Sequence, residues 1–161
     1  MTSELNLIRS LYAYNSRTRA KYLTAIWKLP PRARNRNRGA SYPSLVDIFM
    51  HVLDAYRLWF DEVYGRGATP EWYPLGQRYT LAEARREMRA IDRRVLHALR
   101  SLGPRDLDRR LAVPKRWRTR KQIELRVLLV HMIEEELQHR GEMNALLWQA
   151  GRNPPVTGFD D

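Results

Sequence analysis

Four long stretches in which apolar residues recur every three or four positions constrain the fold of this chain more than any other feature. Such spacing places side chains along one face of an α-helix, and no segment shows the alternation expected of a strand. Proline and glycine separate the stretches, which cover residues 3–28, 44–64, 80–102 and 119–150. We therefore predict an all-α fold, an up-and-down four-helix bundle, formed by a single domain of residues 1–161.

Local signals mark where these helices begin and end. Thr80-Leu-Ala-Glu83 is a capping-box sequence, and Pro30 and Pro31 end the first helix because proline cannot continue one. Gly151 follows the last helix, where glycine readily forms a C-terminal cap. The connections vary in length, and a long one that carries Trp72 follows the second helix.

The last predicted helix places His131, Glu135 and His139 at successive four-residue steps. Two side chains at this spacing share a helix face and can bind one metal ion, for which imidazole and carboxylate are ordinary ligands. His51 in the second helix is the candidate for a further ligand, since bundle cores hold metal ligands projected from facing helices. The competing interpretation makes the histidines hydrogen-bonded core or surface residues and the run 134–136 a solvated face.

The composition excludes several kinds of site. The sequence contains no cysteine, which rules out a disulfide framework, a cysteine zinc site and a thiol nucleophile, so a metal site must use His, Asp or Glu. No stretch approaches about eighteen consecutive apolar residues, and the N-terminus lacks the basic and then apolar order of a signal peptide. We expect a cytoplasmic protein that does not enter a membrane.

The net charge of +11 at pH 7 points to anionic partners. The basic residues form two clusters, which contain Arg32, Arg34, Arg36 and Arg38, and then Lys115, Arg116, Arg118, Arg120 and Lys121. Trp117 in the second cluster is a candidate for stacking on nucleic-acid bases. Arginine stems also cover apolar surface on solvated faces, which is the favoured interpretation. We expect only weak, sequence-independent nucleic-acid binding that disappears near physiological salt.

Residues 123–133 at the start of the last helix are apolar almost all round. One face fills the core, which leaves a second face exposed in a monomer. We assign Leu125, Leu129 and Met132 to that second face. The expected consequence is a homodimer formed largely through this helix, with a contribution from the first helix.

Motifs in three of the predicted helices carry a family resemblance. They are Leu11-Tyr-Ala-Tyr-Asn15, then Ser44-Leu-Val-Asp-Ile-Phe-Met-His51 leading to Trp59, and His139-Arg-Gly-Glu142 followed by Leu146, Leu147 and Gly151. In this order they resemble the DinB-like superfamily of four-helix-bundle proteins, which also contains the bacillithiol- and mycothiol-dependent transferases. The resemblance extends over nearly the whole chain.

The resemblance implies a metal site formed by a histidine of the second helix and two ligands four residues apart on the last helix. These roles fall on His51, Glu135 and His139. Most relatives have histidine in place of Glu135, although mycothiol-dependent members use a carboxylate there, and a carboxylate favours zinc slightly over nickel or iron. His131 is then a neighbour of the ligands or a substitute ligand. Glu142 orients the site, accepts a proton, or pairs with a nearby cation.

The leading functional hypothesis is a divalent-metal-dependent enzyme of thiol-transferase or hydrolase type that acts on a small molecule, with catalytic residues unassigned. Because the chain has no cysteine, a transferase of this kind needs an external low-molecular-weight thiol. The alternatives are a stress-related metal-binding protein without catalysis and a nucleic-acid-binding protein.

Overall fold

The computed structural model describes residues 3–117 and 121–159. The principal helices are α1 (Glu4–Trp27), α3 (Leu45–Arg57), α4 (Leu81–Ser101) and α5 (Leu125–Gln149). The shorter elements are α2 (Pro31–Arg34), the π-helical η1 (Leu58–Tyr64), the 3-10 helices η2 (Pro104–Asp108) and η3 (Lys115–Trp117), and the strands β1 (Arg110–Ala112) and β2 (Gln122–Glu124). The strands form a small antiparallel sheet, in which Leu111 lies opposite Ile123. The prediction of an all-α bundle is confirmed.

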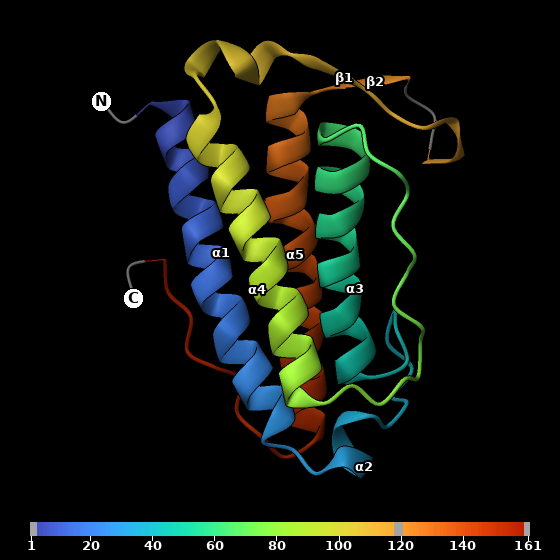
Figure 1. Cartoon of the computed structure of the whole chain (residues 1–161). Helices are drawn as coiled ribbons and strands as arrows, with labels where there is room; N and C mark the ends of the chain where they lie inside the picture. The colour runs from blue at the N-terminus through green and yellow to red at the C-terminus, as the bar shows by residue number, and fades with distance from the viewer. Residues whose placement is uncertain (1–2, 118–120, 160–161) are drawn as a thin grey trace.

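The principal helices run in two directions (Figure 1). Helices α1 and α5 point one way and α3 and α4 the other, because the connection 65–79 passes back along the outside of the bundle before α4 begins (Figure 1). The predicted up-and-down order, in which consecutive helices alternate in direction, therefore does not hold for α3 and α4 (Figure 1). Helix α1 packs against α4 and α5, and α3 packs against α5 and α4. Their apolar faces together form one buried core.

Three of the principal helices have an N-cap residue with a hydroxyl side chain. The hydroxyl oxygens of Ser3, Ser44 and Thr80 each accept a hydrogen bond from a backbone N–H in the first turn, and Thr80 forms the complete predicted capping box. At the end of α5, Gly151 has a φ of +70° and the backbone N–H of Arg152 donates to the Leu147 carbonyl at 2.9 Å. This Schellman cap turns the chain back, so that the C-terminal segment lies beside α1 (Figure 1).

Two predicted helix boundaries differ from the structure. Residues 122–124 form strand β2, so the last helix begins at Leu125 instead of Thr119, which lies outside the described residues. Strand pairing satisfies the backbone there, and the Leu125 N–H donates to the Arg109 carbonyl at 2.9 Å. The second predicted helix changes to π-helical hydrogen bonding at Leu58, and the loop predicted after the first helix contains α2.

The assignment of a dimer face on the last helix is wrong in its residues. Leu125, Leu129 and Met132 are each 0 % exposed, because α5 runs between α1 and α3 and is covered on both of those sides. The large apolar side chains of α5 that are exposed are those of Val127, Val130, Leu137 and Trp148. A dimer contact through α5 would therefore use a different stripe of this helix.

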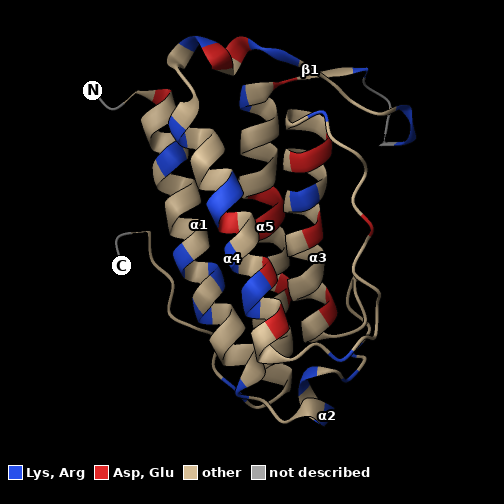
Figure 2. Cartoon of the chain, in the orientation of Figure 1, with Lys and Arg blue, Asp and Glu red and all other residues tan. Residues whose placement is uncertain are grey.

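Basic side chains are spread over α1, α2 and α4 as well as the segment beyond β1 (Figure 2). Arg118 and Arg120 of the second predicted cluster lie outside the described residues, as does the side chain of Trp117. Within the first cluster, the Arg34 and Arg38 guanidinium groups donate to backbone carbonyls of nearby residues. None of the helices among the described residues has the length and hydropathy needed to cross a membrane.

Candidate metal centre

His51, Glu135 and His139 meet between two neighbouring helices. His51 lies on α3 and the other two lie one turn apart on α5, which packs against α3. One ligand atom from each of the three side chains lies within 4.8 Å of the other two. The four-residue spacing and the facing helices thus bring the three predicted residues together.

The contacts within this cluster have the dimensions of a coordination shell. Glu135 Oε1 lies 3.3 Å from His51 Nε2 and 3.2 Å from His139 Nε2. Both separations lie at the long end of the range for N–H···O hydrogen bonds. Zinc bonds of about 2.0–2.1 Å in a tetrahedral arrangement place neighbouring ligand atoms roughly 3.3 Å apart. The two separations from Glu135 Oε1 therefore match this spacing, while all three ligand atoms lie within 4.8 Å of one another.

Glu142 fixes the orientation of the His139 ring. Its Oε2 lies 2.9 Å from His139 Nδ1 and also accepts a hydrogen bond of 2.6 Å from the Ser41 hydroxyl. A carboxylate accepts hydrogen bonds, so Nδ1 carries the proton and a neutral His139 directs the lone pair of Nε2 toward Glu135. A lone pair and a carboxylate oxygen face one another there, an arrangement that calls for a proton or a cation between them.

Ionised groups dominate the electrostatics of the cluster. Hydrogen bonds with His139 and then His51 hold the pKa of the Glu135 carboxyl well below its usual range. Burial acts to lower the pKa of His139, but hydrogen bonds to Glu135 and Glu142 outweigh burial and raise that pKa. Both pKa shifts show that the site favours a positive charge at its centre, which a proton or a metal ion can supply.

Aromatic side chains enclose His51. The Tyr42 ring stacks on the His51 ring with centroids 4.0 Å apart, and the Tyr42 hydroxyl lies 3.1 Å from His51 Nε2. Trp72 lies parallel to the His51 ring at 6.2 Å. Burial, followed by Glu135, raises the pKa of Tyr42, so its hydroxyl stays neutral at physiological pH. A cleft of about 160 Å³ lies beside these rings and is lined by His51 itself.

Two buried carboxylates secure the connection that carries Trp72. The Asp54 Oδ2 atom accepts from the Tyr73 N–H at 2.8 Å, and Asp47 Oδ1 accepts from the Gly76 N–H at 2.7 Å. Both aspartates lie on α3, within one turn of His51. The helix that carries the candidate ligand His51 thus also positions the wall of the cleft formed by residues 72–75.

His131 lies apart from the cluster. Its Nδ1 is 3.4 Å from Glu134 Oε2, and its ring contacts the edge of Trp59. The four-residue step from His131 to Glu135 therefore does not add a third α5 side chain to the group. Of the two neighbours considered from the sequence, Glu142 contacts a candidate ligand and His131 does not.

A buried ionic network on the other side of α5 was not predicted. Glu136 and Arg19 are 2 % and 4 % exposed, and Arg19 Nη2 lies 2.6 Å from Glu136 Oε2. Arg19 Nη1 also pairs with Asp92 at 2.6 Å, and the Tyr56 hydroxyl donates to Glu136 at 2.7 Å. The interpretation of 134–136 as a solvated face therefore holds for Glu134, which is exposed, but not for Glu136.

The model of the DinB family matches residues 1–160 of the chain. The chain belongs to the DinB family. A DinB-like protein from Bacillus cereus has a crystal structure similar to that of this DinB-family chain, with a TM-score of 0.66 and 17 % sequence identity. The match covers 91 % of this chain and 93 % of the other, and at this identity it establishes the fold alone. No curated protein matches the chain.

The residues around the candidate metal centre that the sequence analysis missed are Ser41, Tyr42 and Trp72, all of which lie on connections. Their contacts join positions far apart in the chain, such as Ser41 with Glu142. The only signal in the sequence is the position of Ser41-Tyr42-Pro43 directly before the helix that carries His51.

Proposed function

We propose that this DinB-family protein binds one divalent metal ion through His51, Glu135 and His139. The observation that carries the proposal is the convergence of the two Nε2 atoms on Glu135 Oε1, with Glu142 holding the His139 proton on the opposite ring nitrogen. Two imidazoles and one carboxylate match a catalytic zinc site, which has three protein ligands and an open position. Zinc is the favoured ion, with nickel or iron as alternatives.

We further propose a metal-dependent enzyme of thiol-transferase or hydrolase type. A divalent ion at this site would lower the pKa of a bound water or thiol at neutral pH. The thiol of a transferase must come from a small molecule, since the chain has no cysteine. The cleft of about 160 Å³ beside His51 suits a small reacting group, and the neutral Tyr42 hydroxyl can donate a hydrogen bond to it.

Elemental analysis of the protein, purified without a histidine tag and loaded with zinc, tests the metal site. We expect one ion per chain in the wild type and a strong loss of occupancy in His51→Ala. His131→Ala is the matched control, because it removes a histidine from the helix that supplies two ligands yet leaves the three clustered side chains intact. Full occupancy in His51→Ala would refute the proposed ligand set.

The catalytic part of the proposal needs a separate assay. The zinc-loaded protein is incubated with mycothiol or bacillithiol and an electrophilic acceptor, and consumption of the thiol is followed over time. A rate that falls to background in both the chelated protein and His51→Ala supports a transferase. Hydrolysis of activated esters or amides with the same dependence supports the hydrolase. A metal-loaded protein inactive in both assays favours the alternative of metal binding without catalysis.

A further inference from the structure

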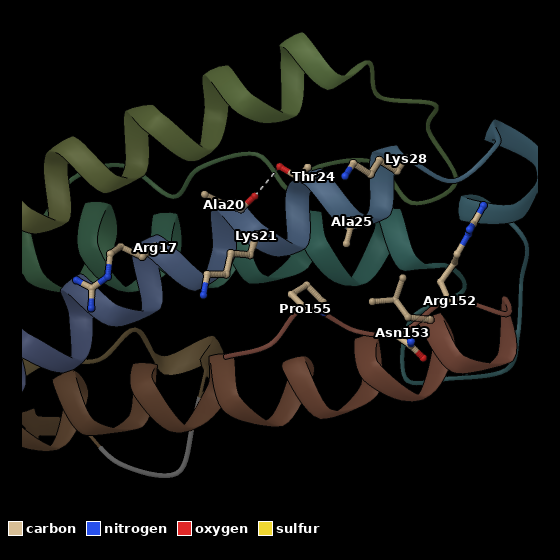
Figure 3. A pocket seen from close by; sticks show the side chains of 10 residues that line it. Arg17, Ala20, Lys21, Thr24, Ala25, Lys28, Arg152, Asn153 and Pro155 are labelled. Carbon is tan, nitrogen blue, oxygen red and sulfur yellow. Dashed lines mark hydrogen bonds between the residues drawn. The ribbon is translucent and has the colours of Figure 1, made fainter. Parts of the chain in front are cut away.

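A second pocket lies between α1, the end of α5 and the segment that follows α5 (Figure 3). Its volume is about 840 Å³, within the usual range for small-molecule sites, and it shares no lining residue with the cleft beside His51. The Schellman cap at Gly151 directs the C-terminal segment toward α1, and Lys21 Nζ donates to the Val156 carbonyl at 3.1 Å. These contacts place the segment as one wall of the pocket.

Within the described part of the chain, four cations and no acidic side chain line the pocket. Arg17 lies at one end, while Lys28 and Arg152 lie at the other (Figure 3). None of these three side chains has a hydrogen bond or an ion pair among the described residues. Arg17, Lys28 and Arg152, which have no acidic partner among the described residues, raise the local concentration of anions around the pocket.

The middle of the pocket is aliphatic. Ala25 and Pro155 lie between the two charged ends (Figure 3), and Ala20 and Leu147 also line the pocket. The Thr24 hydroxyl donates to the Ala20 carbonyl at 3.0 Å, and none of the described residues that line the pocket has an aromatic ring to stack on a base or a ring system. The lining therefore suits an aliphatic chain better than a nucleotide.

The distance between the charged ends limits the length of a ligand. Arg17 and Lys28 are eleven positions apart on α1, which corresponds to roughly 16 Å along the helix axis. Their long side chains can reach toward the centre and shorten the span that a ligand has to bridge. An elongated molecule with an acidic group at each end and an apolar middle fits this arrangement.

We propose that this pocket, which we call the α1 pocket, binds a small elongated dianion with an aliphatic middle. One acidic group pairs with Arg17 near Lys21, and the other pairs with Lys28 and Arg152. The aliphatic part packs on Ala25 and the neighbouring apolar side chains. This binding uses no metal and is independent of the function proposed for the His51 cluster.

Calorimetric titration with decanedioate tests the pocket, with decanoate and decanediol as matched probes that lack one or both charges. We expect one decanedioate to bind per chain. Decanoate should bind about tenfold more weakly, because the ionic contacts at one end are lost, and decanediol should show no measurable binding. Equal affinities for decanedioate and decanoate would overturn the requirement for two acidic groups. Absence of decanedioate binding at millimolar concentration would overturn the site.

Variants locate the binding. Lys28→Gln combined with Arg152→Gln removes two exposed cations and is expected to weaken decanedioate binding about tenfold or more. Arg85→Gln, at an exposed position of α4 outside the α1 pocket, is the control and keeps wild-type affinity. Unchanged affinity in the double variant overturns the location. Affinity that disappears on chelation or in His51→Ala also overturns it, because the ligand would then sit on the metal.

Discussion

Replacing Arg19 with methionine tests whether the buried network of α1 and α5 holds the bundle together. Methionine keeps most of the length and volume of the side chain but removes its charge. The substitution leaves Glu136, which is 2 % exposed, without its ionic contact of 2.6 Å. The Tyr56 hydroxyl still donates to Glu136, and the nearest remaining cation is Arg140, with Nη2 at 3.7 Å from Glu136 Oε1.

The size of the effect follows from what remains around the carboxylate. Removal of one partner of a buried ion pair lowers the free energy of unfolding by about 3–5 kcal/mol, because an uncompensated charge stays in the interior. The contacts of Glu136 with Tyr56 and Arg140 place Arg19→Met near the lower limit, at about 3 kcal/mol. For a chain of this length that loss lowers the melting temperature by roughly 6–12 °C.

Urea unfolding monitored by circular dichroism measures this loss in the free energy of unfolding. Arg17→Met is the matched control, since Arg17 is an exposed arginine two positions away. The double variant Arg19→Met/Glu136→Gln should be more stable than Arg19→Met alone. A double variant that is no more stable than Arg19→Met would refute the reasoning.

Four further predictions concern the metal, the surface and the charge. Glu142→Ala should weaken zinc affinity by about 10- to 100-fold in a competition titration with a chelator, because the His139 ring loses its acceptor; unchanged affinity would exclude an orienting role. Since Glu135 and Glu142 raise the pKa of His139, zinc occupancy should be complete at neutral and basic pH and fall as acid protonates that ring, as dialysis at graded pH will measure; occupancy constant down to pH 4 contradicts histidine ligation. If the protein dimerises through α5, Val130→Glu, at an exposed position, should yield monomers in sedimentation, whereas Leu129→Glu should unfold the chain; a monomeric wild type removes the dimer. Binding to single-stranded DNA should be weak, and the logarithm of the binding constant should fall linearly with the logarithm of the salt concentration; tight binding at physiological salt would instead favour the nucleic-acid-binding alternative.

Local sequence signals predicted the principal helices because each signal and the structure that it specifies lie within one or two turns. The capping box of Thr80 and Glu83 and the glycine at position 151 are of this kind. The start of α5 was predicted too early because β2 depends on pairing with β1, whose residues lie ten to fourteen positions earlier in the chain. The direction of α4 likewise follows from the path of the connection 65–79, which Asp54 and Asp47 secure through backbone N–H groups. Side-chain identity alone does not encode such contacts.

The same distinction applies to the candidate site. The i, i+4 pair Glu135 and His139 was found from spacing, and the bundle fold brought in His51. The groups that orient and enclose these side chains, Ser41 and Tyr42, come from a connection whose position depends on tertiary packing. The exposed face of α5 was misassigned because a helix that is apolar almost all round does not reveal which sides its neighbours cover.

Two i, i+4 pairs run side by side along α5, and this arrangement links the network to the candidate metal site. Glu135 and His139 face α3, whereas Glu136 and Arg140 are one position further along and join residues of α1. Consecutive helix residues point about 100° apart, so a shift of this part of α5 moves both pairs together. Arg19→Met should therefore also weaken zinc affinity, although Arg19 contacts none of the candidate ligands. Equal zinc dissociation constants for Arg19→Met and the control Arg17→Met, measured under conditions where both are folded, would show that the two pairs act independently.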